Sequence, residues 1–201
     1  HGCRHLEQHL DRLAASCRTF GYPFEPGEAR ALLLETCLAL SAGQLHRLRL
    51  AVQPDGRMQV QSAPLQPLNE PVALLLANET THSGELFLRH KTGVRSRYDA
   101  AWRAAEARGA FDALFFNERG ELTEGGRSNV FVRFGGRWYT PPLSCGLLPG
   151  VMRAVLLEAP AWQASERVIT REMLEEADDI VVCNALRGPL RAVIVDDGPA
   201  A

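Results

Sequence analysis

The amino-acid sequence predicts an α+β fold made of two mixed blocks of helices and strands. Amphipathic helices and a hairpin open the chain, a polar stretch without periodicity follows, and short strands separated by turn residues dominate the rest. A length of 201 residues suits one large domain or two small ones. We therefore expect a small N-terminal α/β domain over residues 1–78, a linker at 79–85 and a larger C-terminal domain over 86–201.

Two helices and a hairpin are predicted in the first block. Leu6, Leu10 and Leu13 repeat at helical spacing, and a second amphipathic helix follows Pro26 and Gly27. Alternating apolar residues on both sides of a Pro-Asp-Gly-Arg turn predict the hairpin. The expected ranges are 6–21 and 28–39 for the helices and 45–52, 58–63 and 72–77 for the strands.

The second block begins around Lys91 and continues into an alanine-rich helix that Gly109 ends. Glycine-containing turns then separate short apolar runs typical of strands. The expected ranges are 96–108, 151–158 and 171–177 for helices and 111–116, 129–134, 137–139, 167–170, 180–183 and 191–195 for strands.

The composition excludes several classes of protein. A net charge of −2 argues against nucleic acid or an anionic membrane as the main partner. No apolar run approaches the roughly 18 residues that span a bilayer, and no signal-peptide core follows the first residues. The five cysteines are scattered without a C-x-x-C pair, which predicts no metal site and reduced thiols in a cytoplasmic protein.

Lys91 is the only lysine among 22 basic residues. A surface cation can be arginine at little cost, but only a primary amine can lose its proton and condense with a carbonyl. Lys91 is therefore a candidate covalent catalyst, and a leftover surface lysine is an equally weighted alternative.

Three further stretches are candidate site segments. Residues 123–129, Thr-Glu-Gly-Gly-Arg-Ser-Asn, place a carboxylate beside glycines that let a ligand approach, although a solvated turn explains them too. Residues 146–153, Gly-Leu-Leu-Pro-Gly-Val-Met-Arg, enter a helix whose free N–H groups suit a phosphate, or form an ordinary helix start. Residues 183–186, Cys-Asn-Ala-Leu, end a buried strand at a turn.

In this order, a lysine, T-E-G-G-x-S-N, L-P-G-V-M-R and C-N-A-L, the motifs resemble the class IV aminotransferase family of pyridoxal-phosphate enzymes. This family includes branched-chain and D-amino-acid aminotransferases and 4-amino-4-deoxychorismate lyase. The resemblance runs from about Leu6 to the C-terminus. It implies a small α/β sandwich domain, a larger pseudo-barrel domain, a cofactor between them, and a homodimer.

The resemblance also implies roles for individual residues. Lys91 would bind the cofactor aldehyde and act as the catalytic base, and Glu124 would pair with the pyridine nitrogen. The phosphate would be held by one arginine side chain, a helix start and a second turn, contributed by Arg12, by Val151 and Met152, and by Asn184 and Ala185.

Within the family, the sequence is most similar to the lyases. Met152 replaces a threonine that branched-chain enzymes often carry, and Ser96 stands where aminotransferases often have tyrosine. The implied reaction eliminates pyruvate from 4-amino-4-deoxychorismate and gives 4-aminobenzoate for folate synthesis. The candidates to bind the two substrate carboxylates are Arg47, Arg95 and Arg187, the last two being favoured.

Two alternatives remain open: a class IV aminotransferase of branched-chain or D-amino acids, and a non-catalytic interaction domain of a chorismate-using enzyme. Family members begin with a β-hairpin before the first helix, and this sequence lacks it, so we expect further residues upstream. A fused or associated aminodeoxychorismate synthase is a possible partner.

Overall fold

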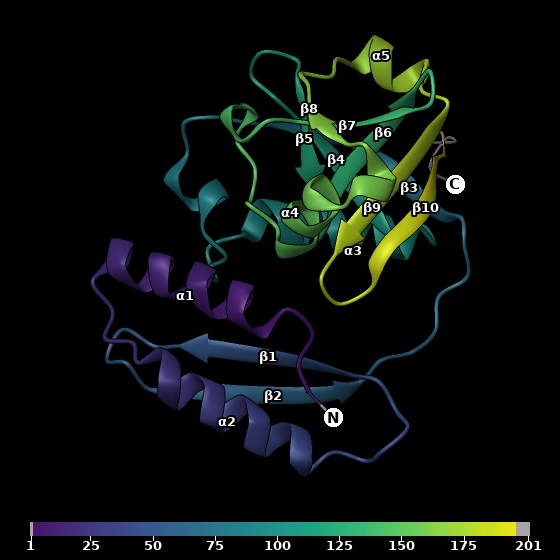
Figure 1. Cartoon of the computed structure of the whole chain (residues 1–201). Helices are drawn as coiled ribbons and strands as arrows, with labels where there is room; N and C mark the ends of the chain where they lie inside the picture. The colour runs from purple at the N-terminus through teal and green to yellow at the C-terminus, as the bar shows by residue number, and fades with distance from the viewer. Residues whose placement is uncertain (1, 196–201) are drawn as a thin grey trace. The chain divides into compact units, whose positions relative to one another are not determined.

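The computed structural model describes residues 2–195, which form two compact units divided between Pro67 and Leu68 (Figure 1). Mixed helices and strands make up both units, as the sequence predicts. We describe each unit by itself.

The first unit packs two helices against a two-stranded antiparallel sheet. Its elements are α1 (Leu6–Phe20), α2 (Pro26–Leu38), β1 (His46–Val52) and β2 (Met58–Pro64). The predicted ranges agree with these bounds to within two residues. Leu10, Ala29 and Leu33 form the small core, against which apolar side chains of the hairpin pack.

The boundary between the units lies before, not after, the strand predicted at 72–77. This strand, β3 (Val72–Thr81), belongs to the second unit because it pairs in parallel with β4 and with β10, and it extends through residues expected to form a linker. A polar segment in a sheet can look like a linker in sequence, since its backbone pairing is invisible there.

The second unit holds an eight-stranded sheet. The strands run in the order β5, β4, β3, β10, β9, β6, β7, β8. The remaining strand bounds are β4 (Asp112–Asn117), β5 (Leu122–Gly125), β6 (Asn129–Phe134), β7 (Arg137–Thr140), β8 (Ser165–Glu166), β9 (Asp179–Asn184) and β10 (Gly188–Ile194).

The sheet curls until its two edges meet. Glu121, just before edge strand β5, forms an antiparallel bridge with Thr170, and the Leu122 amide donates to the Ile169 carbonyl at 2.8 Å. The Arg167 amide bonds to Thr140 at 3.0 Å, which continues the pairing beyond β8. Curling of this kind satisfies edge groups that would otherwise be unpaired. It encloses a core that includes Leu74, Leu114, Leu122, Val130, Val132, Ile169 and Val182.

The α-helices of this unit are α3 (Ser96–Ala107), α4 (Val151–Glu158) and α5 (Arg171–Glu175), and its 3-10 turns are η1 (Leu86–Arg89), η2 (Leu143–Cys145) and η3 (Pro160–Trp162). Ala105 of α3 packs with alanines of β3 and β4, and Leu156 of α4 packs with Phe131 and Val181 of the sheet. Small residues therefore let α3 approach one part of the sheet closely, and large ones cover the part beneath α4.

Two local predictions were wrong. The stretch around Glu124, expected between strands, is itself strand β5, and all four of its residues are buried. The strand predicted at 167–170 lies earlier, at β8, and residues 167–170 lead into α5.

None of the helices in residues 2–195 is long and apolar enough to cross a membrane. The five cysteines are free thiols, as predicted. The Sγ atoms of Cys3 and Cys37 lie 3.3 Å apart in the first unit.

Candidate active site

Lys91 lies in an irregular segment between η1 and α3, where its side chain is exposed. Hydrogen bonds are made on both sides of the lysine. Before η1, Ser83 donates from its amide and its hydroxyl to Glu118, at 2.8 and 2.6 Å. Directly before α3, Arg95 bonds to Asp99 at 2.9 Å and to the Gly126 carbonyl. The stretch that carries the lysine is therefore connected to the turns that follow β4 and β5.

Glu124 is a buried carboxyl group in this region, with 6% of its surface exposed. Asn129 donates from Nδ2 to Glu124 Oε2 at 3.2 Å, and the Leu148 amide also donates to the carboxyl group. Burial nevertheless raises the pKa of Glu124 to about 8, since these bonds replace only part of the lost hydration.

The positive charges of Lys91 and Arg95 both lower the pKa of Glu124, against the larger effect of burial. Lys91 and Glu124 are thus within electrostatic reach of one another although 32 residues separate them along the chain. A lysine amine and a buried carboxyl in one place form a pair able to hold a group that carries both an aldehyde and a basic nitrogen.

The glycines beside Glu124 are required by close packing. A β-carbon on Gly125 would lie 2.4 Å from Asp112 Oδ2, and one on Gly126 would lie 3.0 Å from Asp112 Oδ1. Asp112 is fully buried and accepts from the Ser128 hydroxyl at 2.6 Å and from the Arg127 amide at 3.1 Å. This carboxylate therefore fixes the loop that follows Glu124.

The start of α4 lies beside Glu124 through Asn129. Asn129 Nδ2 donates to the Leu148 carbonyl at 3.0 Å as well as to Glu124. Gly150 is the N-cap residue of α4, and it has no side chain that could accept from the first N–H groups of the helix. The first N–H groups of any α-helix also have no partner inside the helix. The backbone of Val151 and Met152 therefore offers donors at a positive helix end, within the same unit as the lysine and the glutamate.

The side chain of Met152 is not part of this anion-binding surface. It is 8% exposed and packs with Phe131, Leu156, Val181 and Cys183. Met152 therefore packs in the core, and only its backbone N–H group is available to an anion.

Asn184 ends β9, and its side chain shapes the turn. Its Oδ1 accepts from the Arg187 amide at 2.9 Å, and its Nδ2 donates to the Arg127 carbonyl at 3.2 Å. Burial lowers the pKa of Arg127, and the positive charge of Arg187 lowers it further. The predicted turn of Asn184 and Ala185 is thus joined directly to the loop after Glu124.

Two predicted site residues belong to the first unit. Arg12 is half-buried on α1, and Arg47 is exposed on β1, alternating with Leu48 and Leu50, which pack on that unit's core. The second unit brings together Lys91, Glu124 and the α4 start, and contains the turn at 184–187; Arg12 and Arg47 remain predictions.

Sequence reasoning missed three residues of this site: Tyr98, Asp112 and Asn129. Asp112 could have been noticed as the one charge in an otherwise apolar strand. Asn129 lay within a quoted motif, but its two bonds depend on a segment that follows much later in the chain. Tyr98 carried no signal, since tyrosine on a helix is usually a packing residue.

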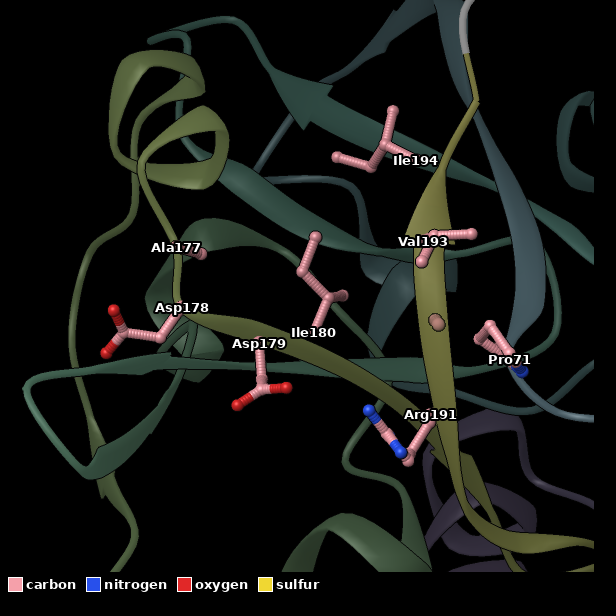
Figure 2. Close-up of a pocket in the computed structure, with 9 residues that line it drawn as sticks. Pro71, Ala177, Asp178, Asp179, Ile180, Arg191, Val193 and Ile194 are labelled. Atoms are coloured by element: carbon pink, nitrogen blue, oxygen red, sulfur yellow. The ribbon is translucent and has the colours of Figure 1, made fainter.

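A shallow hollow elsewhere on the unit, with a volume of about 250 Å³, contains none of the predicted site residues (Figure 2). Its lining comes from Pro71 and from the segments 177–180 and 191–194. The acidic groups there have structural partners: Asp179 pairs with Arg133, and Asp178 accepts from the Gly135 amide at 2.8 Å. We assign no function to this hollow.

Comparison with known proteins gives a consistent family. The model of the amino-transferase class IV family matches residues 1–193. A fission yeast (Schizosaccharomyces pombe) protein named "Putative aminodeoxychorismate lyase" is 29% identical over 94% of this chain and 84% of its own length.

Two solved structures share the fold closely. One, named "Putative amino-acid aminotransferase", from Mesorhizobium loti, is 36% identical, with a TM-score of 0.85 over 94% of this chain and 91% of its own. The other, named "Putative 4-amino-4-deoxychorismate lyase", from Legionella pneumophila, is 27% identical, with a TM-score of 0.84 over 96% of this chain and 78% of its own.

Proposed function

The chain belongs to the class IV aminotransferase family, whose members are pyridoxal-phosphate-dependent enzymes, and from this premise we propose that it is a 4-amino-4-deoxychorismate lyase. The observation that carries the proposal is the convergence of the only lysine, Lys91, with the buried Glu124. Similarity to relatives named as lyases in fission yeast and Legionella supports the choice of reaction.

The residues present fit pyridoxal phosphate. Glu124 is a buried carboxyl whose pKa is raised because its charge is incompletely compensated, and a protonated pyridine nitrogen supplies the missing N–H donor and positive charge. The open N–H groups at the start of α4 suit the phosphate. Lys91 supplies the amine for the aldehyde.

When bound, the cofactor supplies an electron sink for the carbon next to the substrate nitrogen. We propose that Lys91 would hold the cofactor through its amine, and that this amine would act as the base that removes the proton from the amine-bearing carbon of the substrate. Glu124 would keep the pyridine nitrogen protonated. The phosphate would be held by Arg12, by the Val151 and Met152 amides and by the turn at Asn184 and Ala185.

The elimination balances with no further reactant. Lys91 would take the proton from the amine-bearing carbon, the ether bond would break, and the leaving oxygen would receive that proton, so that pyruvate leaves in its enol form. The six-membered ring becomes aromatic as 4-aminobenzoate. Because aromatisation favours this direction, the protein needs mainly to position the substrate and exclude competing protonation.

Of the arginines proposed for the substrate carboxylates, we favour Arg187. Arg95 already bonds to Asp99 and to the Gly126 carbonyl, which suits a residue that holds the Glu124 loop. Arg47 and Arg95 remain candidates. A homodimer and an associated synthase are also part of the proposal.

The first test uses the full chain with pyridoxal phosphate, reduced with borohydride and mapped by peptide mass. We expect a phosphopyridoxyl group on Lys91 and its loss in Lys91→Arg, which keeps the charge. The N-terminal amine is the necessary internal control, since it is the other primary amine in the chain. A folded protein without the Lys91 adduct would contradict any enzyme function through this lysine.

A second test distinguishes the lyase from an aminotransferase. The 36% identity to the Mesorhizobium protein favours the aminotransferase. Pyruvate should be released from 4-amino-4-deoxychorismate without an amino acid donor. Conversion of the cofactor to its pyridoxamine form by a donor amino acid, without pyruvate release from aminodeoxychorismate, would instead establish the aminotransferase.

A further inference from the structure

Tyr98 is fixed in the first turn of α3, close to Glu124. Its ring packs against Phe115 with 4.7 Å between centroids at an interplanar angle of 59°, and the Arg95 guanidinium lies 5.9 Å from the ring centroid. A β-carbon on Gly126, two residues after Glu124, would lie 3.1 Å from the Tyr98 carbonyl, so the backbone at Tyr98 lies close to the loop that follows Glu124. The Tyr98 ring itself contacts Phe115 and Arg95.

The Tyr98 hydroxyl is buried and makes no regular hydrogen bond within residues 2–195. A buried hydroxyl without a partner is unfavourable, so such groups usually mark an interaction that forms in another charge or ligand state. Burial raises the pKa of Tyr98, and Glu124 raises it further; Tyr98 in turn acts against burial to lower the pKa of Glu124, so the two groups are coupled.

We propose that Tyr98 is a positioning residue for Glu124: its hydroxyl donates a hydrogen bond to the ionised carboxylate and so favours the charged, oriented form. The pair would exist in the ligand-free protein. The consequence for catalysis rests on the proposed function, in which the charged carboxylate keeps the pyridine nitrogen protonated.

Other groups face Glu124, but none replaces this donor. Asn129 and the Leu148 amide donate from the sheet and from the α4 side. Arg95 is bonded to Asp99 and Gly126, and the Lys91 amine would change its charge during the reaction. The Tyr98 hydroxyl differs from these groups because it makes no other hydrogen bond within residues 2–195 and is therefore available to Glu124.

The test measures the Glu124 carboxyl directly in ligand-free protein. Carbon-13 NMR of labelled glutamate side chains gives a titration for each carboxyl, and Glu124→Gln identifies the signal. We expect the pKa of Glu124, about 8 in the unmodified protein, to become higher by about one pH unit in Tyr98→Phe, as loss of one charge-assisted hydrogen bond predicts. Tyr139→Phe, the same change in β7 of the same unit, should leave it unaltered.

A second measurement tests the same hydrogen bond in protein without a substitution, so its main result does not require Tyr98→Phe to fold. Incorporation of 3-fluorotyrosine preserves the shape of the ring and makes the hydroxyl a stronger donor, so it should lower the pKa of Glu124. Repeating the incorporation in Tyr98→Phe should abolish that effect, because the other two tyrosines, Tyr22 and Tyr139, remain labelled.

An unchanged Glu124 pKa in folded Tyr98→Phe and in the fluorinated protein would overturn the inference. If such a variant also bound pyridoxal phosphate more weakly, the hydroxyl would be a cofactor contact instead. A missing Lys91 adduct would refute the proposed function while leaving the Tyr98–Glu124 titration intact, so the two failures are distinguishable.

Discussion

The Oδ1 atom of Asn129 lies 1.9 Å from the position that a β-carbon on Gly150 would occupy. The strand that begins at Asn129 and the helix that begins after Gly150 are therefore in direct contact. Glycine at position 150 lets one amide side chain bond to Glu124 and to the Leu148 carbonyl at once.

Gly150→Ala should consequently destabilise the protein by about 1–3 kcal/mol, the usual cost of inserting a methyl group into a filled site. It should also weaken phosphate binding, because Asn129 must move. Urea unfolding measures the first effect and titration with pyridoxal phosphate the second. Gly84→Ala is the matched control, since a β-carbon there has nothing within 4 Å; equal losses in both variants would refute the argument.

Glu124 should make the ligand-free protein less stable as pH rises. Its folded pKa of about 8 lies above the ordinary 4.5, so the unfolded chain binds fewer protons between these values. This stability is fully present below about pH 4.5 and is lost progressively as pH rises through 8. The difference across this range is on the order of 3–5 kcal/mol, at about 1.4 kcal/mol per pH unit.

Glu124→Gln should remove this pH dependence, because an amide does not ionise. Unfolding measured from pH 5 to pH 9 in both proteins tests this, and parallel curves would contradict it. The same variant should lower the rate of pyruvate release by about 10²-fold or more if the carboxylate stabilises the ring charge.

Asp112→Ala should cost about 2–4 kcal/mol, because the Ser128 hydroxyl and the Arg127 amide lose a buried acceptor. The Glu124 loop should loosen as well, which hydrogen exchange at the Arg127 amide would report. Asp178→Ala removes an exposed acceptor from the Gly135 amide and should cost about 1 kcal/mol or less. A loss at Asp112 no larger than that at Asp178 would show that the loop is held by other contacts.

Met152→Thr restores the hydroxyl found in branched-chain enzymes but should not strengthen cofactor binding. The Met152 side chain is packed with Phe131 and Val181, so threonine leaves a gap and a buried hydroxyl and should cost about 2–4 kcal/mol. Met152→Leu conserves volume and should cost less than about 1.5 kcal/mol. Thermal unfolding of both variants, with cofactor affinity, tests this; a tighter-binding threonine variant would contradict the packing.

The regular elements could be predicted closely where one residue pattern decides them. The spacing of Leu6, Leu10 and Leu13 defines α1, and alternation defines the β1–β2 hairpin. Patterns failed where long-range pairing decides. Thr123 and Glu124 are polar and glycine follows them, so a turn was expected, yet Leu114 pairs with Gly125 and makes a buried strand.

The residues of the candidate site also differ in whether the sequence alone indicates them. Motif order predicts Lys91, Glu124 and the helix start as site residues, because those residues carry chemistry that few others can supply. Asp112 holds the loop after Glu124 by accepting hydrogen bonds from residues far along the chain, and the sequence around Tyr98 gives no sign of its neighbours. Arg95 remains a candidate for the substrate carboxylates, and its bond to the Gly126 carbonyl also suits a residue that holds the Glu124 loop.

The pairing of β3 with β10 has a consequence for synthesis of the chain. β3 begins the second unit and β10 is the last strand described, yet they lie side by side in the middle of the sheet, with Val72 opposite Ala192. A ribosome must therefore finish nearly the whole unit before its central strands can pair. Until then β3 and β9 both expose an unpaired edge, so a chain stalled before Gly188 should need a chaperone to remain unaggregated.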